Sequence, residues 1–351
     1  MGSHMGRQKP KAIDLFSGCG GTTQGLREAG FSVVGAVEKD SLAVATYRRN
    51  HKRVKVWECD ICDLDPNTFL RSHGISYGDL DLLVGCPPCQ AFSSIRRLNG
   101  KRLVRDRANK DLIFEYLRFV EGLAPKVVLI ENVPRIVDDY RFSQVRKRLC
   151  ALGYIGKPAI FNAAHYGVPQ RRRRMIYIAS RVGTILYADP VPDKERLTVR
   201  EAIGYLPTPG CTGDELHDFP ELRSERIWNL ITAIPKNGGS RGDLGRKHQL
   251  KCHKKCDGFK DVYGRMAWNS VAPTITGGCV NPSKGRFLHP EQDRTITLRE
   301  AALLQSFPED YFFSTERGKF GVATMIGNAF PPKLVKHHAI CIRKHLQAHD
   351  N

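Results

Sequence analysis

The stretch DLLVGCPPCQAFS, residues 81–93, decides the fold prediction. An apolar run follows Asp81 and ends at Gly85, a pattern typical of a buried strand that leads into a loop. Pro88 fixes the backbone immediately before Cys89, so the thiol is held by a stiff chain at the carboxyl end of the strand. Ligands bind at that edge of open α/β sheets. Cys89 is therefore a candidate nucleophile, although a single buried cysteine is more often a small apolar residue that closes a strand.

The composition is that of an ordinary globular chain with a strong positive charge. Its 351 residues can form one or two domains. Lysines and arginines number 55 against 36 acidic residues, and the net charge of +19 favours a polyanionic partner, with nucleic acid as the first candidate. Eleven cysteines without the spacing of a disulfide framework favour a reducing, cytoplasmic setting. No apolar run approaches the roughly 18 residues of a membrane span, so we expect no membrane association.

The N-terminal segment has the order of an adenosine-binding unit. An apolar strand at residues 12–16 leads into the glycine turn SGCGG at 17–21, and a helix pattern then ends at Gly30. A second strand delivers Glu38, which can accept hydrogen bonds from both hydroxyls of a ribose. Because the turn lacks the GxGxxG spacing, it favours an adenosine cofactor without a pyrophosphate over a dinucleotide.

A third short strand, at residues 54–57, leads to Asp60 and Ile61. The carboxylate of Asp60 can accept from an adenine amino group while Ile61 packs on the ring. The competing interpretation of Asp60, as a helix cap or turn residue, is the more common role for an aspartate in this position.

Two groups of side chains leave zinc open as an alternative. A four-thiolate knuckle would use two cysteine pairs, but the 23 residues between them and the prolines inside the second pair disfavour it. The other group lies in the irregular part of the chain and lacks the paired geometry of a finger. The residues are Cys59, Cys62, Cys86 and Cys89 for the first group, and His248, Cys252, His253 and Cys256 for the second.

A strongly basic segment, residues 95–110, follows the candidate nucleophile. Such a run is usually a solvated loop, but beside a reacting group it could close over phosphates as a lid. Beyond a helix predicted at 112–123, Glu131 follows four apolar residues at the end of another strand. A carboxyl group there is poorly hydrated, which favours its protonated form and suits it to donate a proton. Capping the helix after Pro134 is the alternative.

Four arginines, residues 171–174, run into an apolar strand at 175–179. The period of two places Arg172 and Arg174 on one face, so that one pair can point into a site while the other contacts water or phosphate. A helix at 141–152 and a strand near residue 160 precede them.

From about residue 187 the alternation of strands and helices is lost, which predicts a second, smaller and less regular domain with a basic surface. Order returns with a helix that starts at Leu298 and has Thr297 as its cap. A strand-like turn is expected at Gly327 and Asn328, followed by a helix that covers the sheet.

The ordered blocks DLFSGCGG, PPCQAFS, ENV, QRRRR, REAALLQSFP and GNAFPP resemble those of the DNA cytosine-5 methyltransferases, especially the small bacterial restriction-modification type. The resemblance spans residues 12–345 and rests on six blocks in the right order. It implies an α/β fold with a Rossmann-like, S-adenosylmethionine-dependent sheet and a target-recognition domain. The catalytic domain would comprise 6–186, completed by 318–351, and the small domain with its hinge would comprise 187–317.

The resemblance also implies the chemistry. Cys89 would add to C6 of cytosine, Glu131 would protonate N3 and Arg174 would hold O2, with Arg172 steadying the thiol loop and phosphate. The methyl group would come from S-adenosyl-L-methionine, leaving S-adenosyl-L-homocysteine. The implied cofactor-binding residues are Phe16, Gly18, Gly20, Glu38, Asp60, Ile61, Pro88 and Asn328. The family often has an aromatic residue after the ribose acid, where this chain has Lys39.

The implied substrate is double-stranded DNA, with the target cytosine turned out of the helix. DNA contacts are expected from Gln90, Arg96, Arg97, Arg107 and Thr274. We expect a cytoplasmic monomer that needs no metal and can work beside a cognate restriction endonuclease. The alternatives are a tRNA cytosine-5 methyltransferase, a catalytically silent DNA-binding regulator on this fold, and a hydride-transferring dehydrogenase.

Overall fold

The computed structural model describes residues 8–88, 111–245 and 261–349. The chain divides into two compact units. Unit 1 comprises Met1–Phe161, Arg173–Asp189 and Leu334–Asn351, and unit 2 comprises Asn162–Arg172 and Pro190–Lys333. Unit 2 thus takes residues 162–172 and 318–333, which the predicted division assigned to the catalytic domain. Within the described ranges, no helix has both the length and the apolar character to cross a bilayer.

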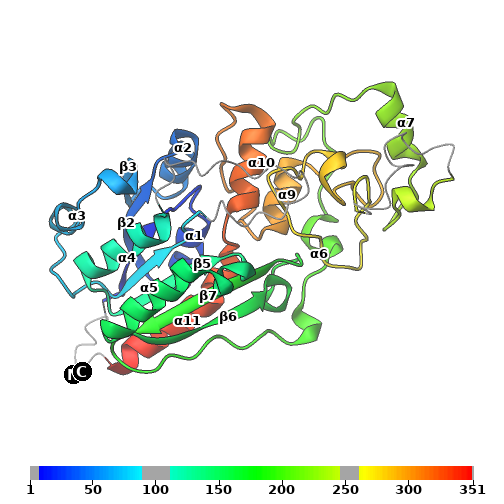
Figure 1. Ribbon diagram of the computed structural model, residues 1–351. Coiled ribbons are helices and arrows are strands. Elements are labelled where there is room, and N and C mark those ends of the chain that lie inside the picture. Colours follow the sequence, from blue (N-terminus) through cyan, green and yellow to red (C-terminus); the bar gives the residue numbers. More distant parts are fainter. Residues whose placement is uncertain (1–7, 89–110, 246–260, 350–351) are drawn as a thin grey trace, which may run out of the picture. The chain divides into compact units, whose positions relative to one another are not determined.

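Unit 1 is built on a seven-stranded sheet of order β3-β2-β1-β4-β5-β7-β6 (Figure 1). The pairs from β3 through β5 are parallel, and β7 runs antiparallel to β5. The strand order reverses at β1, between β2 and β4, and such a reversal opens a ligand-binding crevice at the carboxyl edge. The strands are β1 Lys11–Leu15, β2 Ser32–Glu38, β3 Lys55–Glu58, β4 Leu82–Gly85, β5 Val127–Asn132, β6 Ile155–Asn162 and β7 Arg173–Ser180.

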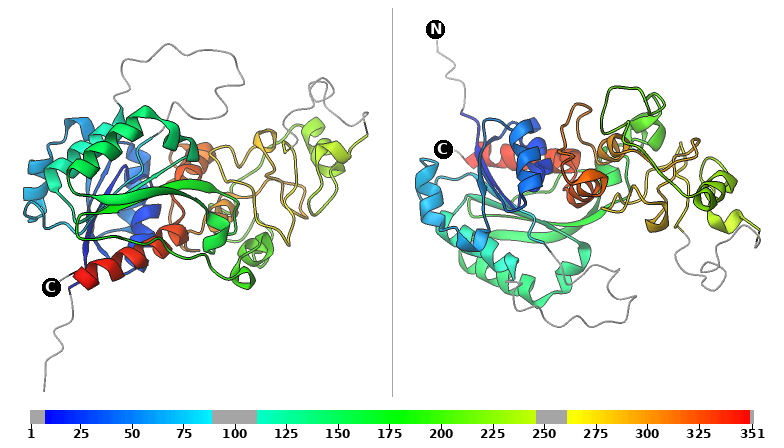
Figure 2. Two further views of the ribbon diagram at one scale, coloured as in Figure 1. Left: turned by 60° about the horizontal axis from the view of Figure 1, so that its bottom comes forward. Right: turned by 90° about the horizontal axis from the view of Figure 1, so that it is seen from above.

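Helices cover both faces of this sheet (Figure 2). One face carries α1 Gly21–Glu28, α2 Ser41–Asn50 and α11 Pro332–His349, and the other carries α3 Pro66–Ser72, α4 Leu112–Leu123 and α5 Tyr140–Ala151. The α/β fold class is therefore confirmed, as are the helices expected at 112–123 and 141–152. Aspartates cap several of these helices: the side chains of Asp40, Asp65 and Asp139 each accept a first-turn amide.

The strand that carries the DLLVGC stretch is locked to α4 through Tyr116. The Tyr116 hydroxyl lies 3.0 Å from the carbonyl of Leu83 and 3.2 Å from that of Leu129, so it bridges β4 and β5. A Cβ atom at Gly85 would lie 2.3 Å from the Tyr116 ring. Glycine is therefore required at the end of β4 for this close packing, and the strand ends where the sequence indicated.

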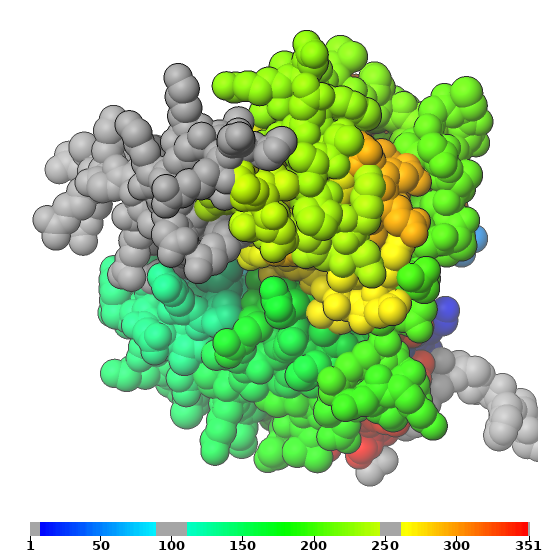
Figure 3. All heavy atoms as spheres, turned by 90° about the vertical axis from the view of Figure 1, so that its right-hand side faces the viewer, coloured from blue at the N-terminus to red at the C-terminus, as the bar shows by residue number. Residues whose placement is uncertain are grey.

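Unit 2 is irregular, as the loss of periodicity predicted. The α-helices in the described part of unit 2 are α6 Val199–Ile203, α7 Glu225–Ala233, α9 Leu298–Leu304 and α10 Gly318–Asn328. The chain also forms short 3-10 helices: η1 Ile61–Asp63 and η4 Pro134–Asp138 in unit 1, and η5 Ala163–Tyr166, η6 Asp193–Glu195, η7 Arg241–Asp243 and η9 Pro282–Lys284 in unit 2. Figure 3 shows the side of unit 2 that carries α7.

Two local predictions in unit 2 have opposite outcomes. Thr297 caps α9 in a full capping box with Glu300, as expected. The strand-like turn at Gly327 and Asn328 is wrong, because these residues form the last turn of α10. A Cβ atom on Gly327 would lie 2.3 Å from the Gly277 nitrogen, so glycine here serves close helix packing rather than a turn.

A fully buried arginine, Arg265, joins several backbone segments of unit 2. Its guanidinium donates to the carbonyls of Ile231, Ile234, His289 and Gln292, and it forms an ion pair with Asp293. One side chain thus satisfies four backbone carbonyl groups in a unit with little regular structure.

Candidate active site

The turn after β1 is built from residues with unusual backbone conformations. Phe16, Gly18 and Gly20 have φ angles of 58°, 53° and 95°. The amide of Ser17 donates to the Val37 carbonyl at 3.1 Å, which holds the turn against β2. A Cβ atom placed on Gly18 would have no neighbouring heavy atom within 4 Å. The glycine turn therefore leaves free space beside Gly18, as a bound cofactor requires.

Glu38, at the end of β2, is fixed by three backbone amides. Its Oε2 accepts from Gly18 at 2.9 Å, and its Oε1 accepts from Lys39 and Asp40 at 2.8 Å each. A carboxylate has about four lone-pair positions, so one on Oε2 is left for a ligand. The predicted ribose acid is thus held in place by the same turn that is expected to line the cofactor pocket.

Asp60 caps the 3-10 helix η1, and its Oδ1 accepts from the Cys62 amide at 3.0 Å. The cap interpretation of this residue is therefore confirmed. Its Oδ2 lies 3.5 Å from the Lys39 Nζ. Hydrogen bonding to Cys62, and then the charge of Lys39, lower the pKa of Asp60. Ile61 is buried in the core of unit 1.

Beneath the glycine turn lies a buried acid that the sequence analysis missed. Asp14, on β1, is fully buried; its Oδ2 accepts from the Thr23 hydroxyl at 2.8 Å, and that hydroxyl lies 2.7 Å from the hydroxyl of Tyr47. Burial raises the pKa of Asp14 to about 7, the Thr23 hydrogen bond opposes this, and the charge of Glu38 adds to it. The available signal was a lone carboxylate inside the apolar strand AIDLF.

Glu131 and Arg174 meet at the carboxyl end of β5. Arg174 Nε lies 2.9 Å from Glu131 Oε1, and the two side chains are 15% and 9% exposed. The antiparallel register of β5 and β7 pairs Glu131 with Ile176 and thereby brings Arg174 to this edge. The expectation of a helix-capping role for Glu131 is not met, because η4 has no side-chain cap.

The next residue, Asn132, ties the proline loop to β5. Its Nδ2 donates to the carbonyl of Pro87 at 2.9 Å, and its Oδ1 accepts from the Val133 amide at 2.8 Å. Pro88 follows on the surface. The ENV block therefore anchors the backbone that leads to Cys89, a positioning role that the sequence analysis did not assign to Asn132.

Cys86 precedes the prolines, and its surroundings disfavour the reactive thiolate form. Desolvation, and then the charges of Glu131 and Asp14, raise the pKa of Cys86 well above its ordinary value. Among the described residues, no three metal-binding side chains are grouped so that they could hold an ion. The alternative of a zinc knuckle would need Cys59, Cys62 and Cys86 beside Cys89, and the three described cysteines are not grouped in this way.

The arginine block shows the predicted alternation, with Arg172 and Arg174 more buried than their neighbours. In unit 2, Arg172 is 1% exposed and donates to the carbonyls of Ile275, Gly327 and Ala329 at 2.9–3.1 Å. These partners show that Arg172 organises the backbone of unit 2, a role that the sequence did not predict.

Two further candidate residues lie in unit 2. Thr274 is exposed in part and its hydroxyl donates to the Arg171 carbonyl at 2.7 Å, while Asn328 is exposed at the end of α10. Other candidates lie outside the described residues: Cys89, Gln90, Arg96, Arg97, Arg107, His248, Cys252, His253 and Cys256.

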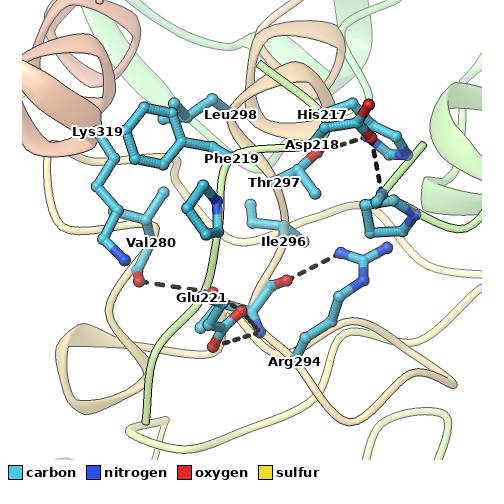
Figure 4. Close-up of a pocket in the computed structure, with 14 residues that line it drawn as sticks. His217, Asp218, Phe219, Glu221, Val280, Arg294, Ile296, Thr297, Leu298 and Lys319 are labelled. Carbon is cyan, nitrogen blue, oxygen red and sulfur yellow. Dashed lines mark hydrogen bonds between the residues drawn. The ribbon is translucent and has the colours of Figure 1, made fainter. Parts of the chain in front are cut away.

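Unit 2 also contains a cavity of about 260 Å³ (Figure 4). Phe219, Ile296 and Leu298 supply apolar walls. The polar groups around it bind one another: His217 contacts Thr297 at 2.9 Å, and Arg294 forms a bidentate ion pair with Glu300 at 2.7 and 2.8 Å. The sequence analysis did not predict this cavity, and its polar lining serves the packing of unit 2.

Comparisons with known proteins agree on one family. The model of the C-5 cytosine-specific DNA methylases matches residues 10–344. The Type II methylase M.HgiDII of Herpetosiphon aurantiacus is 35% identical over 347 residues, covering 95% of each chain. The Type II methyltransferase M1.HphI of Haemophilus parahaemolyticus is 32% identical over 339 residues, covering 95% of this chain and 86% of the relative.

Solved structures show the same fold. A prophage-encoded protein of E. coli, assigned as a DNA modification methyltransferase, superposes with a TM-score of 0.69 at 24% identity, covering 96% of this chain and 99% of that one. S. pombe Dnmt2 methyltransferase gives 0.63 at 17% identity, covering 98% and 100%. The chain thus belongs to the C-5 cytosine-specific DNA methylase family and is an enzyme of the DNA (cytosine-5)-methyltransferase class.

Proposed function

We propose that this enzyme methylates C5 of one cytosine within a specific short sequence of duplex DNA, using S-adenosyl-L-methionine. The names of its relatives as Type II methyltransferases support a place in a bacterial restriction-modification system, beside an endonuclease that cuts the same site. The net charge of +19 supports a polyanionic substrate. We further propose that the enzyme acts as a monomer in the bacterial cytoplasm.

The observation that carries the mechanism is the junction of β5 with the proline loop. Glu131 is paired with Arg174 there, and the adjacent Asn132 holds the Pro87 carbonyl, two residues before Cys89. This places the proposed acid on the strand that anchors the nucleophile's loop. Preorganised groups on rigid elements are what proton transfer and nucleophilic addition require.

In the proposed reaction, the Cys89 thiolate forms a bond to C6 of the cytosine while Glu131 delivers a proton to N3. The ring thereby becomes an enamine, and Arg174 holds its O2. S-adenosyl-L-methionine, when bound, supplies an electrophilic methyl group and leaves as S-adenosyl-L-homocysteine. C5 of the enamine takes this methyl group. Loss of the C5 proton to a base or water, return of the N3 proton to Glu131 and expulsion of the Cys89 sulfur then restore the C5–C6 double bond and give 5-methylcytosine.

The edge of the sheet fits the cofactor by its donor and acceptor set. Glu38 keeps a lone pair for the ribose hydroxyls, Asp60 offers an acceptor for the adenine amino group, and the open space at Gly18 allows close approach. The other residues proposed to hold the cofactor are Phe16, Gly20, Ile61, Pro88 and Asn328.

For the DNA, we propose that the target base leaves the helix, since C5 and C6 are inaccessible to a nucleophile and a methyl donor inside a duplex. Residues 187–317 would read the neighbouring bases, and Thr274 would contact the turned-out nucleotide. Gln90, Arg96, Arg97 and Arg107 would contact the DNA from the segment after the nucleophile.

The test is transfer of a labelled methyl group to duplex DNA and, in parallel, to transfer RNA, followed by bisulfite sequencing of the product. We expect label in DNA, at cytosines in one sequence context. Label in RNA alone would overturn the proposal in favour of a tRNA methyltransferase. Binding of DNA without transfer to either substrate would favour the catalytically silent alternative.

A further inference from the structure

Lys39 and Asp60 form an ion pair at the carboxyl edge of two neighbouring strands. Lys39 directly follows β2, Asp60 follows β3 by two residues, and the parallel register places Glu38 opposite Glu58. The Lys39 Nζ lies 3.5 Å from the Asp60 Oδ2, with the side chains 63% and 39% exposed. The pair therefore lies next to Glu38, the acid that holds the glycine turn.

This pair offers one hydrogen-bond acceptor beside one donor. Asp60 uses its Oδ1 for the Cys62 amide, which leaves Oδ2 for Lys39 and for a ligand. An ionised carboxylate can only accept hydrogen bonds, and an ammonium group can only donate them. The strand edge thus presents a hydrogen-bond acceptor, Asp60 Oδ2, and a hydrogen-bond donor, Lys39 Nζ, that lie 3.5 Å apart.

Adenine carries the complementary pattern on one edge, because its amino group donates and the adjacent ring nitrogen accepts. Hypoxanthine has a carbonyl oxygen in place of the amino group, and this acceptor would face the acceptor of Asp60. From this match we infer that Lys39 acts with Asp60 as a specificity determinant that recognises the adenine of the cofactor. The inference rests on the cofactor site proposed above and adds a donor to it.

The alternative is that Lys39 and Asp60 form an ordinary surface ion pair, which generally contributes little. The chain offers a matched control. Arg48 Nη1 lies 2.8 Å from Glu58 Oε2, and these side chains are 53% and 37% exposed. Arg48→Met and Lys39→Met each remove one positive charge and one exposed ion pair close to the same strand, so they differ mainly in the proposed ligand contact.

The experiment is isothermal titration of the full chain with S-adenosyl-L-homocysteine and with its deaminated analogue, S-inosylhomocysteine. We expect Lys39→Met to weaken binding of the adenine compound by about five- to tenfold, the size of one lost hydrogen bond. The affinity for the analogue should change by less than about twofold. The preference for the adenine compound over the analogue should therefore fall by nearly as much as the affinity for the adenine compound. Lys39→Arg, which keeps a donor, should retain most of the selectivity, and Arg48→Met should behave like the unmodified protein.

Two results overturn the inference and are distinguishable. If the unmodified protein binds S-adenosyl-L-homocysteine but Lys39→Met keeps its selectivity, Lys39 is not a specificity determinant, and the cofactor site stands. If the unmodified protein does not bind the adenine compound at all, the cofactor site itself is wrong and the inference fails with it.

Discussion

Arg174 Nε lies 2.9 Å from Glu131 Oε1, and this ion pair joins the ends of the antiparallel strands β7 and β5. Both side chains are largely enclosed, so the guanidinium and carboxyl groups replace water as each other's polar partner. Removing one partner from such a pair leaves an uncompensated charge. The two residues therefore act as one unit, and their substitutions should not be additive.

Glu131→Gln keeps the size of the side chain and removes the proton donor. We expect the methyl-transfer rate to fall by about 10²- to 10⁴-fold, the usual contribution of general acid catalysis, while DNA binding changes little. Single-turnover transfer and a DNA-binding titration measure the two effects. Glu121→Gln is the matched control, because it removes the exposed ion pair with Arg148. Unimpaired transfer by the Glu131 variant would contradict its role as the acid.

Asp14 should make the stability of unit 1 depend on pH. Burial raises the pKa of Asp14 from 3.8 to about 7, so between these values the folded state binds more protons than the unfolded state. Asp14 therefore lowers the free energy of unfolding as the pH rises from about 4 to 7. Asp14→Asn should remove this loss of stability. The melting temperature of the variant should therefore rise relative to that of the unmodified protein as the pH increases from about 4 to 7.

The pH dependence of the melting temperature must be compared between Asp14→Asn and a control variant. The reason is that buried histidines change the free energy of unfolding with pH in the opposite direction. Burial lowers the pKa of His51 and His289 to about 4 and that of His338 to about 3, so their contribution disfavours folding as the pH falls below 6.5. Asp79→Asn, at an exposed loop residue, serves as the control. Parallel melting curves for the two variants would refute the assignment to Asp14.

Arg265→Met should destabilise unit 2 selectively. The substitution leaves the carbonyls of Ile231, Ile234, His289 and Gln292 without their donor and Asp293 without a buried partner. The expected loss is about 3–5 kcal/mol, as for other broken buried pairs. Hydrogen exchange should report faster exchange in α7 and little change in the sheet of unit 1. Arg196→Met, which removes a surface pair with Asp193, should leave the exchange pattern unchanged.

The positive charge should make DNA affinity strongly dependent on salt. If lysines and arginines neutralise several phosphates, the dissociation constant should rise by orders of magnitude between about 50 and 200 mM salt. A fluorescence-anisotropy titration with a duplex containing the methylated site measures the slope. A response of less than about twofold would mean that the basic residues face away from the DNA.

Local patterns in the sequence were sufficient to locate the strands of unit 1, but not their order in the sheet. Apolar runs with glycine or acidic ends marked the strands, and they placed Glu38, Asp60 and Glu131 at the ends where the structure has them. The cap of α9 was also predictable, because a capping box involves residues only three positions apart.

Features that depend on distant parts of the chain were not predictable. Arg172 donates to carbonyls more than 100 residues away, and the end of α10 was mistaken for a turn because Gly327 serves packing against residues 276–277. The role of Asp14 depends on Thr23 and Tyr47, which only the packing of α1 and α2 brings together. No local spacing encodes such contacts.

The proposed reaction depends on a covalent bond between the Cys89 sulfur and C6 of the target cytosine. The most direct test gives the enzyme S-adenosyl-L-methionine and a duplex in which 5-fluorocytosine replaces the target base, because fluorine cannot leave C5 as a proton does. We expect a stable protein–DNA adduct, with the link mapped to Cys89 by mass spectrometry and absent from Cys89→Ser. A protein that methylates the ordinary duplex but forms no adduct, or forms one through another residue, would contradict it.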